Sequence, residues 1–116
     1  MRADDLGIRG TESPAELEAD DALRSRLESI RLRAGRLMQL GDVTDTAVPK
    51  LTMVSAPTAG GDISTRTFIP HRCHEAIGVF GAVSVATAAL LPGTPAADVT
   101  RPGAGAYGML TCEHPT

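Results

Sequence analysis

RTFIPHRCHEAIGVFGAVSVATAALLPG, residues 66–93, is the stretch that decides the fold. It reads as a strand, a tight basic turn and then a helix with almost no polar face. Between residues 76 and 91 the only polar side chains are Ser84 and Thr87. A helix that is apolar on every face is a buried helix, and about 20 residues are needed to cross a bilayer. These 16 residues therefore predict a core helix of a globular domain.

Titratable side chains are concentrated directly before this helix, at His71, Arg72, Cys73, His74 and Glu75. The first turn of a helix presents N–H groups without intrahelical partners and a partial positive charge, which together favour anions. A thiol and two imidazoles at such an end could act on a bound anion. The sequence therefore predicts that this junction is one half of an active site.

Length and charge limit the classes of protein to consider. A chain of 116 residues makes one domain at most. Its net charge of −3 and the lack of any basic stripe argue against binding to nucleic acid. Residues 1–50 hold 18 of the 25 charged side chains, so the rest of the chain has few groups to cover a solvated surface. This asymmetry predicts a partner surface, for another chain, a missing first domain or a second copy in a homodimer.

Cysteine content and the first residues suggest the compartment. Cys73 and Cys112 are the only cysteines, and without a secretory signal they read as reduced thiols. The opening residues MRADDLGIRG contain no apolar targeting segment. We expect a cytoplasmic protein with no membrane partner.

The first part of the chain is predicted to be loop and helix. Residues 1–12 show no periodicity and are expected to be loop or disordered. Residues 13–40 form a helical segment in which Ser13 and Glu16 make a capping box and Asp20 caps a longer helix. One apolar seam follows, with spacings of four and three residues: Leu23, Leu27, Ile30, Ala34 and Leu37.

Arginines occupy the other faces of the same helix: Arg24, Arg26, Arg31, Arg33 and Arg36. We expect them to keep the helix soluble and to form ion pairs four residues apart, such as Asp20 with Arg24.

Residues 41–116 are predicted to form an incomplete strand, hairpin, buried helix and strand unit. Residues 50–56 and 63–69 alternate as strands, and the Gly-containing run at 59–62 joins them as a hairpin. A last strand is expected at residues 107–113. The fold class is therefore α+β, with a mixed or antiparallel sheet around the buried helix.

Several short motifs resemble, in order and spacing, those of the PrpF family. They are LESIR (27–31), GDV (41–43), VPK (48–50), RTFIPH (66–71), HEAIG (74–78), GAV (81–83), LPGT (91–94) and EHPT (113–116). The similarity covers most of residues 13–116. The family contains methylaconitate isomerases and 4-oxalomesaconate tautomerases, and these motifs look closest to those of the tautomerases.

This resemblance implies a diaminopimelate-epimerase-like fold, in which two similar domains each wrap a sheet around a central helix. It implies proton transfer on a small tri- or dicarboxylate and no cofactor. Family members are several times longer, so the chain is expected to be a fragment of the second domain. The first-domain cysteine and lysine that the family is understood to use would then be absent, and the fragment alone would be inactive.

Four residues are candidates for the site. The family places a histidine at His74, so we assign it a catalytic role. Cys73 corresponds approximately to a catalytic cysteine of the epimerases, and a helix N-terminus would lower its thiol pKa. Arg66 could hold a substrate carboxylate bidentately, and His71 could touch substrate. Each also has a structural alternative: a cap, a buried apolar thiol, a solvated strand residue and a turn former.

Two further functions remain open on the sequence alone. The first is a non-catalytic binding or interaction module derived from the same fold. The second is a metal-binding turn formed by His71, Cys73 and His74 with His114. No Cys-x-x-Cys or His-x-x-x-His pair supports these donors, so we assign no metal ligand.

Overall fold

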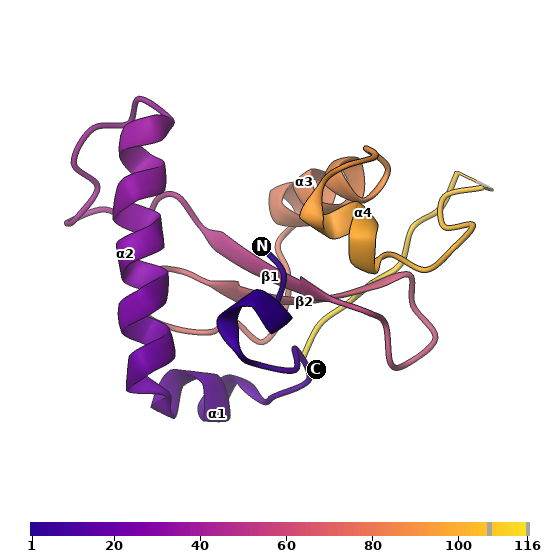
Figure 1. The fold of residues 1–116 in the computed structure, drawn as a ribbon, viewed down its shortest axis with the longest axis horizontal. Helices are drawn as coiled ribbons and strands as arrows, with labels where there is room; N and C mark the ends of the chain where they lie inside the picture. Colours follow the sequence, from indigo (N-terminus) through magenta and orange to yellow (C-terminus); the bar gives the residue numbers. More distant parts are fainter. Residues whose placement is uncertain (107, 116) are drawn as a thin grey trace.

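The computed structural model describes residues 1–106 and 108–115. A three-stranded sheet lies between two groups of helices, with α2 (Asp21–Leu37) on one side and α3 (Val79–Ala89) and α4 (Pro95–Val99) on the other (Figure 1). Within the described residues, every helix is too short or too polar to cross a membrane.

Residues 1–12 are held against the sheet. Ala3 donates its N–H to the carbonyl of Val54 at 2.8 Å, and Val54 donates to the carbonyl of Met1 at the same distance. A short 3₁₀ helix follows at Asp4–Leu6. Ala3 is only 1% exposed, so this segment contributes to the core.

The helical segment begins as the sequence predicts. Ser13 and Glu16 form the reciprocal capping box of α1 (Pro14–Ala19), and the Asp20 carboxylate accepts the N–H of Leu23 at the start of α2. The apolar seam of α2 is buried at Leu23 and Leu27, whereas Leu37, the last residue predicted in the seam, is 75% exposed. The capping box and the seam together fix where both helices start and which face of α2 meets the sheet.

Two expectations about the arginines of α2 are wrong. Arg24 pairs with Asp21 at 3.7 Å, since the Asp20 carboxylate is used as the helix cap. Arg31 has no exposed surface. Its guanidinium binds the Glu28 carboxylate through two atoms, at 2.6 and 2.8 Å, and donates to backbone carbonyls of the loop after the helix. Arg31 is therefore a buried anchor for that loop.

The sheet has the mixed character expected. β1 (Leu51–Ser55) pairs antiparallel with β2 (Ile63–Phe68), and β2 pairs in parallel with β3 (Cys112–Glu113). The last strand is shorter than the predicted 107–113, and Tyr107 lies outside the described residues. Because β2 is central and covered on both faces, all six of its residues are buried.

Alternation along the strands separates two apolar clusters, one on each face of the sheet. Phe68 and Met53 face α1 and α2, whereas Ile63 and Val54 face α3 and α4. The first cluster consists of Ala3, Leu17, Leu23, Leu27, Leu51, Met53, Phe68 and Cys73. The second consists of Val54, Ile63, Val85, Ala89 and Ala96.

The apolar helix starts later than the sequence suggests. Its first residue is Val79 with Gly78 as N-cap, so residues 71–75 do not form a helix N-terminus. Cys73 instead pairs with Phe68 in an antiparallel bridge. Residues held in a strand-like ladder cannot also adopt helical dihedrals, which delays the helix.

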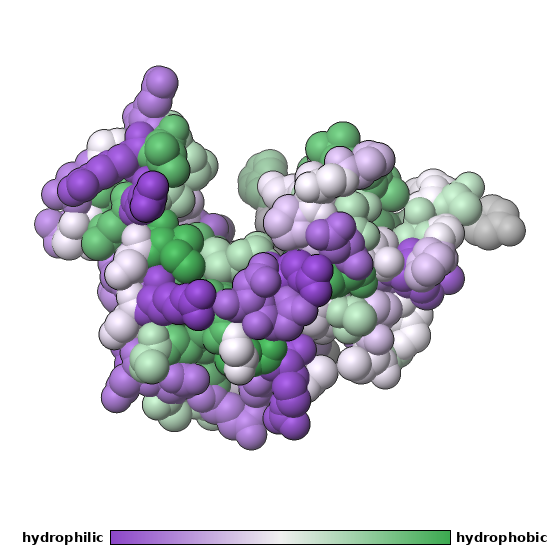
Figure 2. Space-filling view, in the orientation of Figure 1, coloured by the Kyte–Doolittle hydropathy of each residue, from purple (hydrophilic) through white to green (hydrophobic). Residues whose placement is uncertain are grey.

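Burial of α3 is confined to one face. Val85 and Ala89 are buried, whereas Val79, Phe80 and Val83 are 78, 88 and 59% exposed. The expectation of burial on every face is therefore not met by these residues. A groove of about 560 Å³, lined in part by Phe80, lies between α3 and the segment around Met38 and Val48 that follows α2. Figure 2 shows a hollow between the side of the molecule that holds α2 and the side that holds α3 and α4.

Replacing Phe80 by glutamate is expected to suppress self-association of the chain. Burying an exposed phenylalanine contributes about 1.5–3 kcal/mol, so we expect the association constant to fall at least about tenfold, measured by sedimentation velocity. Thr87→Glu adds the same charge on an exposed, polar position of the same helix and should leave association nearly unchanged. A wild-type chain that stays monomeric at high concentration would contradict this prediction.

Glu113 joins β3 to the hairpin between β1 and β2. Its carboxylate accepts the backbone N–H groups of Thr58, Ala59 and Gly61 at 2.7–2.8 Å. A Cβ on Gly61 would lie 2.6 Å from Glu113 Cγ, so glycine is required for this approach. Burial acts to raise the pKa of Glu113, but the three N–H donors outweigh it and hold the pKa below its ordinary value of 4.5.

Replacing Glu113 by glutamine should reduce both stability and its dependence on acid. Hydrogen bonds to a charged acceptor contribute more than neutral ones, so we expect a loss of about 1–2 kcal/mol in urea unfolding at pH 7. Because the pKa is lower in the folded state, this stabilisation is complete above the ordinary carboxyl pKa and disappears as the pH falls through the folded value. Glu113→Gln should therefore reduce the loss of unfolding free energy as the pH falls below about 4.5. Asp45→Asn, at an exposed loop position, should leave this pH dependence unchanged.

Candidate functional site

The candidate site is built on a tight turn that leaves β2 and returns along it. Ile69 donates its N–H to the carbonyl of Arg72 at 3.0 Å, and His74 donates to the carbonyl of Thr67 at 2.9 Å. These two bonds flank the Phe68–Cys73 bridge. The backbone of Cys73 and His74 is therefore fixed by the central strand of the sheet.

Beside this turn is a cavity of about 590 Å³. One wall is the turn and the segment after it, and the other wall is α1. The lining residues are Pro14, Ala15, Glu18, Ile69, Arg72, Cys73, His74, Glu75 and Ala76. The structure thus brings together the two residues assigned a catalytic role, Cys73 and His74, in one concave site.

The Cys73 thiol is buried, with 6% of the residue exposed. Burial raises its pKa to about 11; the positive charge of Arg66 opposes this rise and the negative charge of Glu18 adds to it. The expectation of a lowered thiol pKa is therefore wrong, because no helix begins at Cys73. At neutral pH the side chain is a thiol, which can donate a proton but is a weak nucleophile.

Arg66 lies on β2 and does not line this cavity. Its Nε donates to the carbonyl of Glu12 at 2.9 Å, and Nη1 donates to the carbonyl of Thr65 at the same distance. With 8% of the residue exposed, its guanidinium is engaged with the backbone. Its contribution at the cavity is its charge, which acts on the Cys73 thiol.

His71 faces a different part of the molecule. It lines a separate cavity along α2 with Asp21, Arg24, Ser25, Glu28, Ser29 and Leu32. The pKa of Glu28 in this cavity is lowered chiefly by its hydrogen bond from Arg31, with His71 as a smaller contribution. The structure therefore separates His71 from Cys73 and His74, although the three lie within four residues of sequence.

Sequence reasoning missed Glu18. This residue lies near the end of α1, and its Oε1 accepts the backbone N–H of Cys73 at 2.9 Å. The same oxygen lies 3.8 Å from Nε of Arg72. The partner is 55 residues away in the chain, so helix periodicity carried no signal for this contact.

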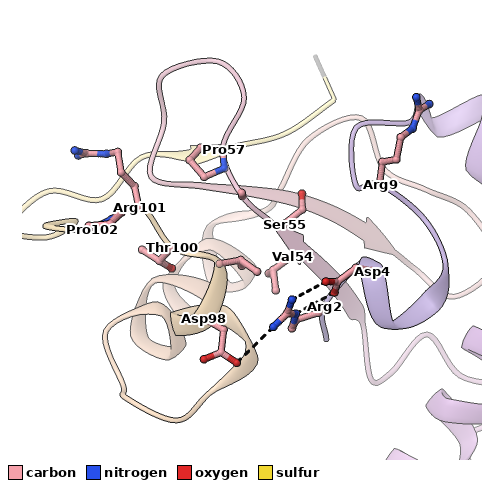
Figure 3. A pocket seen from close by; sticks show the side chains of 12 residues that line it. Arg2, Asp4, Arg9, Val54, Ser55, Pro57, Asp98, Thr100, Arg101 and Pro102 are labelled. Carbon is pink, nitrogen blue, oxygen red and sulfur yellow. Dashed lines mark hydrogen bonds and ion pairs between the residues drawn. The ribbon is translucent and has the colours of Figure 1, made fainter.

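Another cavity, of about 520 Å³, lies between the N-terminal segment, β1 and α4. Arg2 reaches into it between Asp4 and Asp98, as Figure 3 shows. The other two arginines of its lining are also paired, Arg101 with Asp62 and Arg9 with Glu12. Each of these arginines therefore has an acidic partner within the protein.

Metal donors were the other possibility for residues 71–74. Across residues 1–106 and 108–115, histidine, cysteine and acidic side chains do not gather in any group of three that could hold a metal ion. His71 and His74 line different cavities, so the metal-binding turn has no support in the geometry.

The sequence and the fold of this chain are similar to those of known proteins. A family model described as PrpF protein matches residues 1–116, and the chain belongs to this family. The crystal structure of a methylitaconate-delta-isomerase superposes on the whole chain with a TM-score of 0.92 at 21% identity, over 35% of its own length. The expected α+β class with a mixed sheet is confirmed, and the chain has the fold of the corresponding part of that isomerase.

Relatives of known name are isomerases. The chain is 53% identical over 116 residues to (4E)-oxalomesaconate Delta-isomerase of Novosphingobium sp. (strain KA1) and 54% identical over 114 residues to 4-oxalomesaconate tautomerase of Pseudomonas putida. These matches cover 100 and 98% of this chain. A 2-methyl-aconitate isomerase of Shewanella oneidensis is 29% identical over 111 residues. The chain spans about a third (32%) of the length of the first two relatives.

Proposed function

We propose that this chain provides one wall of the active site of a cofactor-independent isomerase that acts on a small tricarboxylate such as 4-oxalomesaconate. The names of the two oxalomesaconate isomerases that the chain resembles support the reaction class. The observation that carries the proposal is the cavity in which the Cys73 thiol and the His74 imidazole come from adjacent residues of a turn fixed to the sheet.

The proposed chemistry is proton transfer within one conjugated system. The His74 imidazole takes a proton from the carbon beside the keto group, and the electron pair of that C–H bond moves into the conjugated system. The Cys73 thiol returns a proton at the other end, and the imidazolium then reprotonates the thiolate. No electrons are gained or lost overall, so the reaction requires no redox cofactor.

We further propose that the chain alone is inactive. Proton transfer needs a substrate held within hydrogen-bond reach of both groups, and in this structure Arg66 is already engaged with backbone carbonyls. Groups that hold the substrate carboxylates would come from the two thirds of the relatives' length that this chain does not match. The missing first domain, or a partner chain, is the proposed source.

A chimera tests the proposal. The 114 matched residues of the Pseudomonas putida relative are replaced by those of this chain, and 4-oxalomesaconate turnover is followed by the absorbance change between its keto and enol forms. We expect activity within about tenfold of the relative, and none above the buffer rate from the chain alone.

Two outcomes would overturn parts of the proposal. A folded chimera that binds the substrate without turning it over would point to a non-catalytic binding module. Turnover by the isolated chain at the rate of the chimera would show that no further wall is needed. Circular dichroism and gel filtration establish that each protein is folded before its activity is compared.

A further inference from the structure

The backbone N–H of Cys73 points away from the sheet. In the antiparallel bridge with Phe68, the bonds to β2 are made by residues on either side, Ile69 with Arg72 and His74 with Thr67. The N–H of Cys73 therefore lies on the outer edge of this ladder, where no strand can accept it. Glu18 accepts it across the edge, at 2.9 Å.

We propose that Glu18 is the positioning residue of this site: its carboxylate fixes the Cys73 backbone and thereby the place of Cys73 and His74 in the cavity lining. The role in catalysis given to Glu18 rests on the proposed function, whereas the tests below use no substrate and do not depend on it. Glu18 acts through Cys73, so it is distinct from the groups that would exchange protons with substrate.

Glu18 lies on a capped helix that packs into the core. α1 is closed by its capping box, and Leu17, the neighbour of Glu18, is 1% exposed in the core. The Glu18 side chain is 32% exposed, so it lies at the rim of the cavity with its backbone anchored beneath.

The charge of Glu18 has a second consequence. A carboxylate beside a thiol disfavours the thiolate, so Glu18 adds to the effect of burial and keeps Cys73 protonated, the state that a proton donor needs. The Arg72 guanidinium lies 3.8 Å from the same oxygen. Its positive charge partly offsets the repulsion between the Glu18 carboxylate and an anionic substrate. Glu18 therefore fixes the backbone at the thiol and adds to the burial that keeps the thiol protonated.

Two variants separate the hydrogen bond from the charge. Glu18→Gln keeps an oxygen that can accept the Cys73 N–H but removes the charge, whereas Glu18→Ala removes both. In a Cys112→Ser background, the rate of Cys73 alkylation by iodoacetamide is measured against pH on the chain itself. We expect Glu18→Gln to raise the rate at pH 8 at least about threefold, by shifting the profile to lower pH.

Amide hydrogen exchange of Cys73 reports the positioning directly. Loss of the acceptor in Glu18→Ala should speed this exchange at least about tenfold, with a smaller change in Glu18→Gln. Asp21→Asn, an equal charge change at an exposed acid on α2 (94% exposed), should leave both measurements at wild-type values.

Unchanged exchange in Glu18→Ala, or an unchanged alkylation profile in Glu18→Gln, would overturn the inference. Should Glu18→Ala fail to fold by circular dichroism, the profile of Glu18→Gln decides alone. Neither measurement uses substrate, so an inactive chimera would refute the proposed function and leave this result as it stands.

Discussion

Replacing Arg31 by alanine is expected to lower the free energy of unfolding by about 3–5 kcal/mol, as for other buried ion pairs that lose one partner. The Arg31 side chain is 1% exposed, and Nη1 donates to the carbonyls of Val43 and Val48 at 2.9 and 2.7 Å. Alanine would remove the Arg31 donors from the Glu28 carboxylate and from these carbonyls, which would keep hydrogen bonds from Thr46. A small domain has only about 5–15 kcal/mol of stability, so this loss would be a large part of the total.

Urea unfolding followed by circular dichroism measures this loss. Arg31→Lys should be intermediate, at about 2 kcal/mol, because an ammonium keeps the charge but cannot bind Glu28 bidentately while also reaching the loop. Arg33→Ala removes an exposed arginine of the same helix and should change stability by less than about 0.5 kcal/mol. Equal losses in Arg31→Ala and Arg33→Ala would show that the anchor contributes nothing.

Arg31 is a residue whose burial the sequence pattern could not predict. Heptad-like spacing identifies the apolar seam through Leu23 and Leu27, and the structure buries both. The same pattern assigns every arginine to solvent, because it registers only the helix's own periodicity. The loop that wraps Arg31 has no periodicity, so its carbonyls could not be placed around the guanidinium beforehand.

The strands were predictable for a similar reason. Alternation and a Gly-rich turn predict β1 and β2 to within one residue at each end, and their two faces follow from the period of two. The start of α3 was not, since residues 71–75 contain no strand pattern. Their pairing with β2 is a tertiary contact that overrides the helical tendency of the apolar run after them.

The candidate site also has a part that was predictable from the sequence and a part that was not. Cys73 and His74 were assigned from the sequence and share a cavity, whereas the cavity's α1 wall depends on a contact across 55 residues. Burial also reverses the expected direction of the Cys73 pKa. Local composition thus indicated which groups are present, and only the fold determined which of them meet and in what protonation state.

In the active chimera, replacing His74 by glutamine is expected to lower kcat by about 10²–10⁴-fold, the usual contribution of a positioned acid or base. Glutamine keeps a similar size and polarity but cannot take a proton from carbon. KM should change much less than kcat, because the backbone bond from His74 to Thr67 holds the turn whatever the side chain.

His71→Gln is the matched control for this prediction. It makes the same replacement three residues earlier, on a side chain that lines the cavity along α2 rather than the one with Cys73. We expect its kcat to stay within about threefold of the unmodified chimera. Equal losses at both histidines would mean that the turn acts only through its fold. Loss at His71 alone would move the proton-transfer site to the α2 side. Only loss confined to His74 fits an imidazole that works beside a protonated Cys73, because that pair alone shares one cavity.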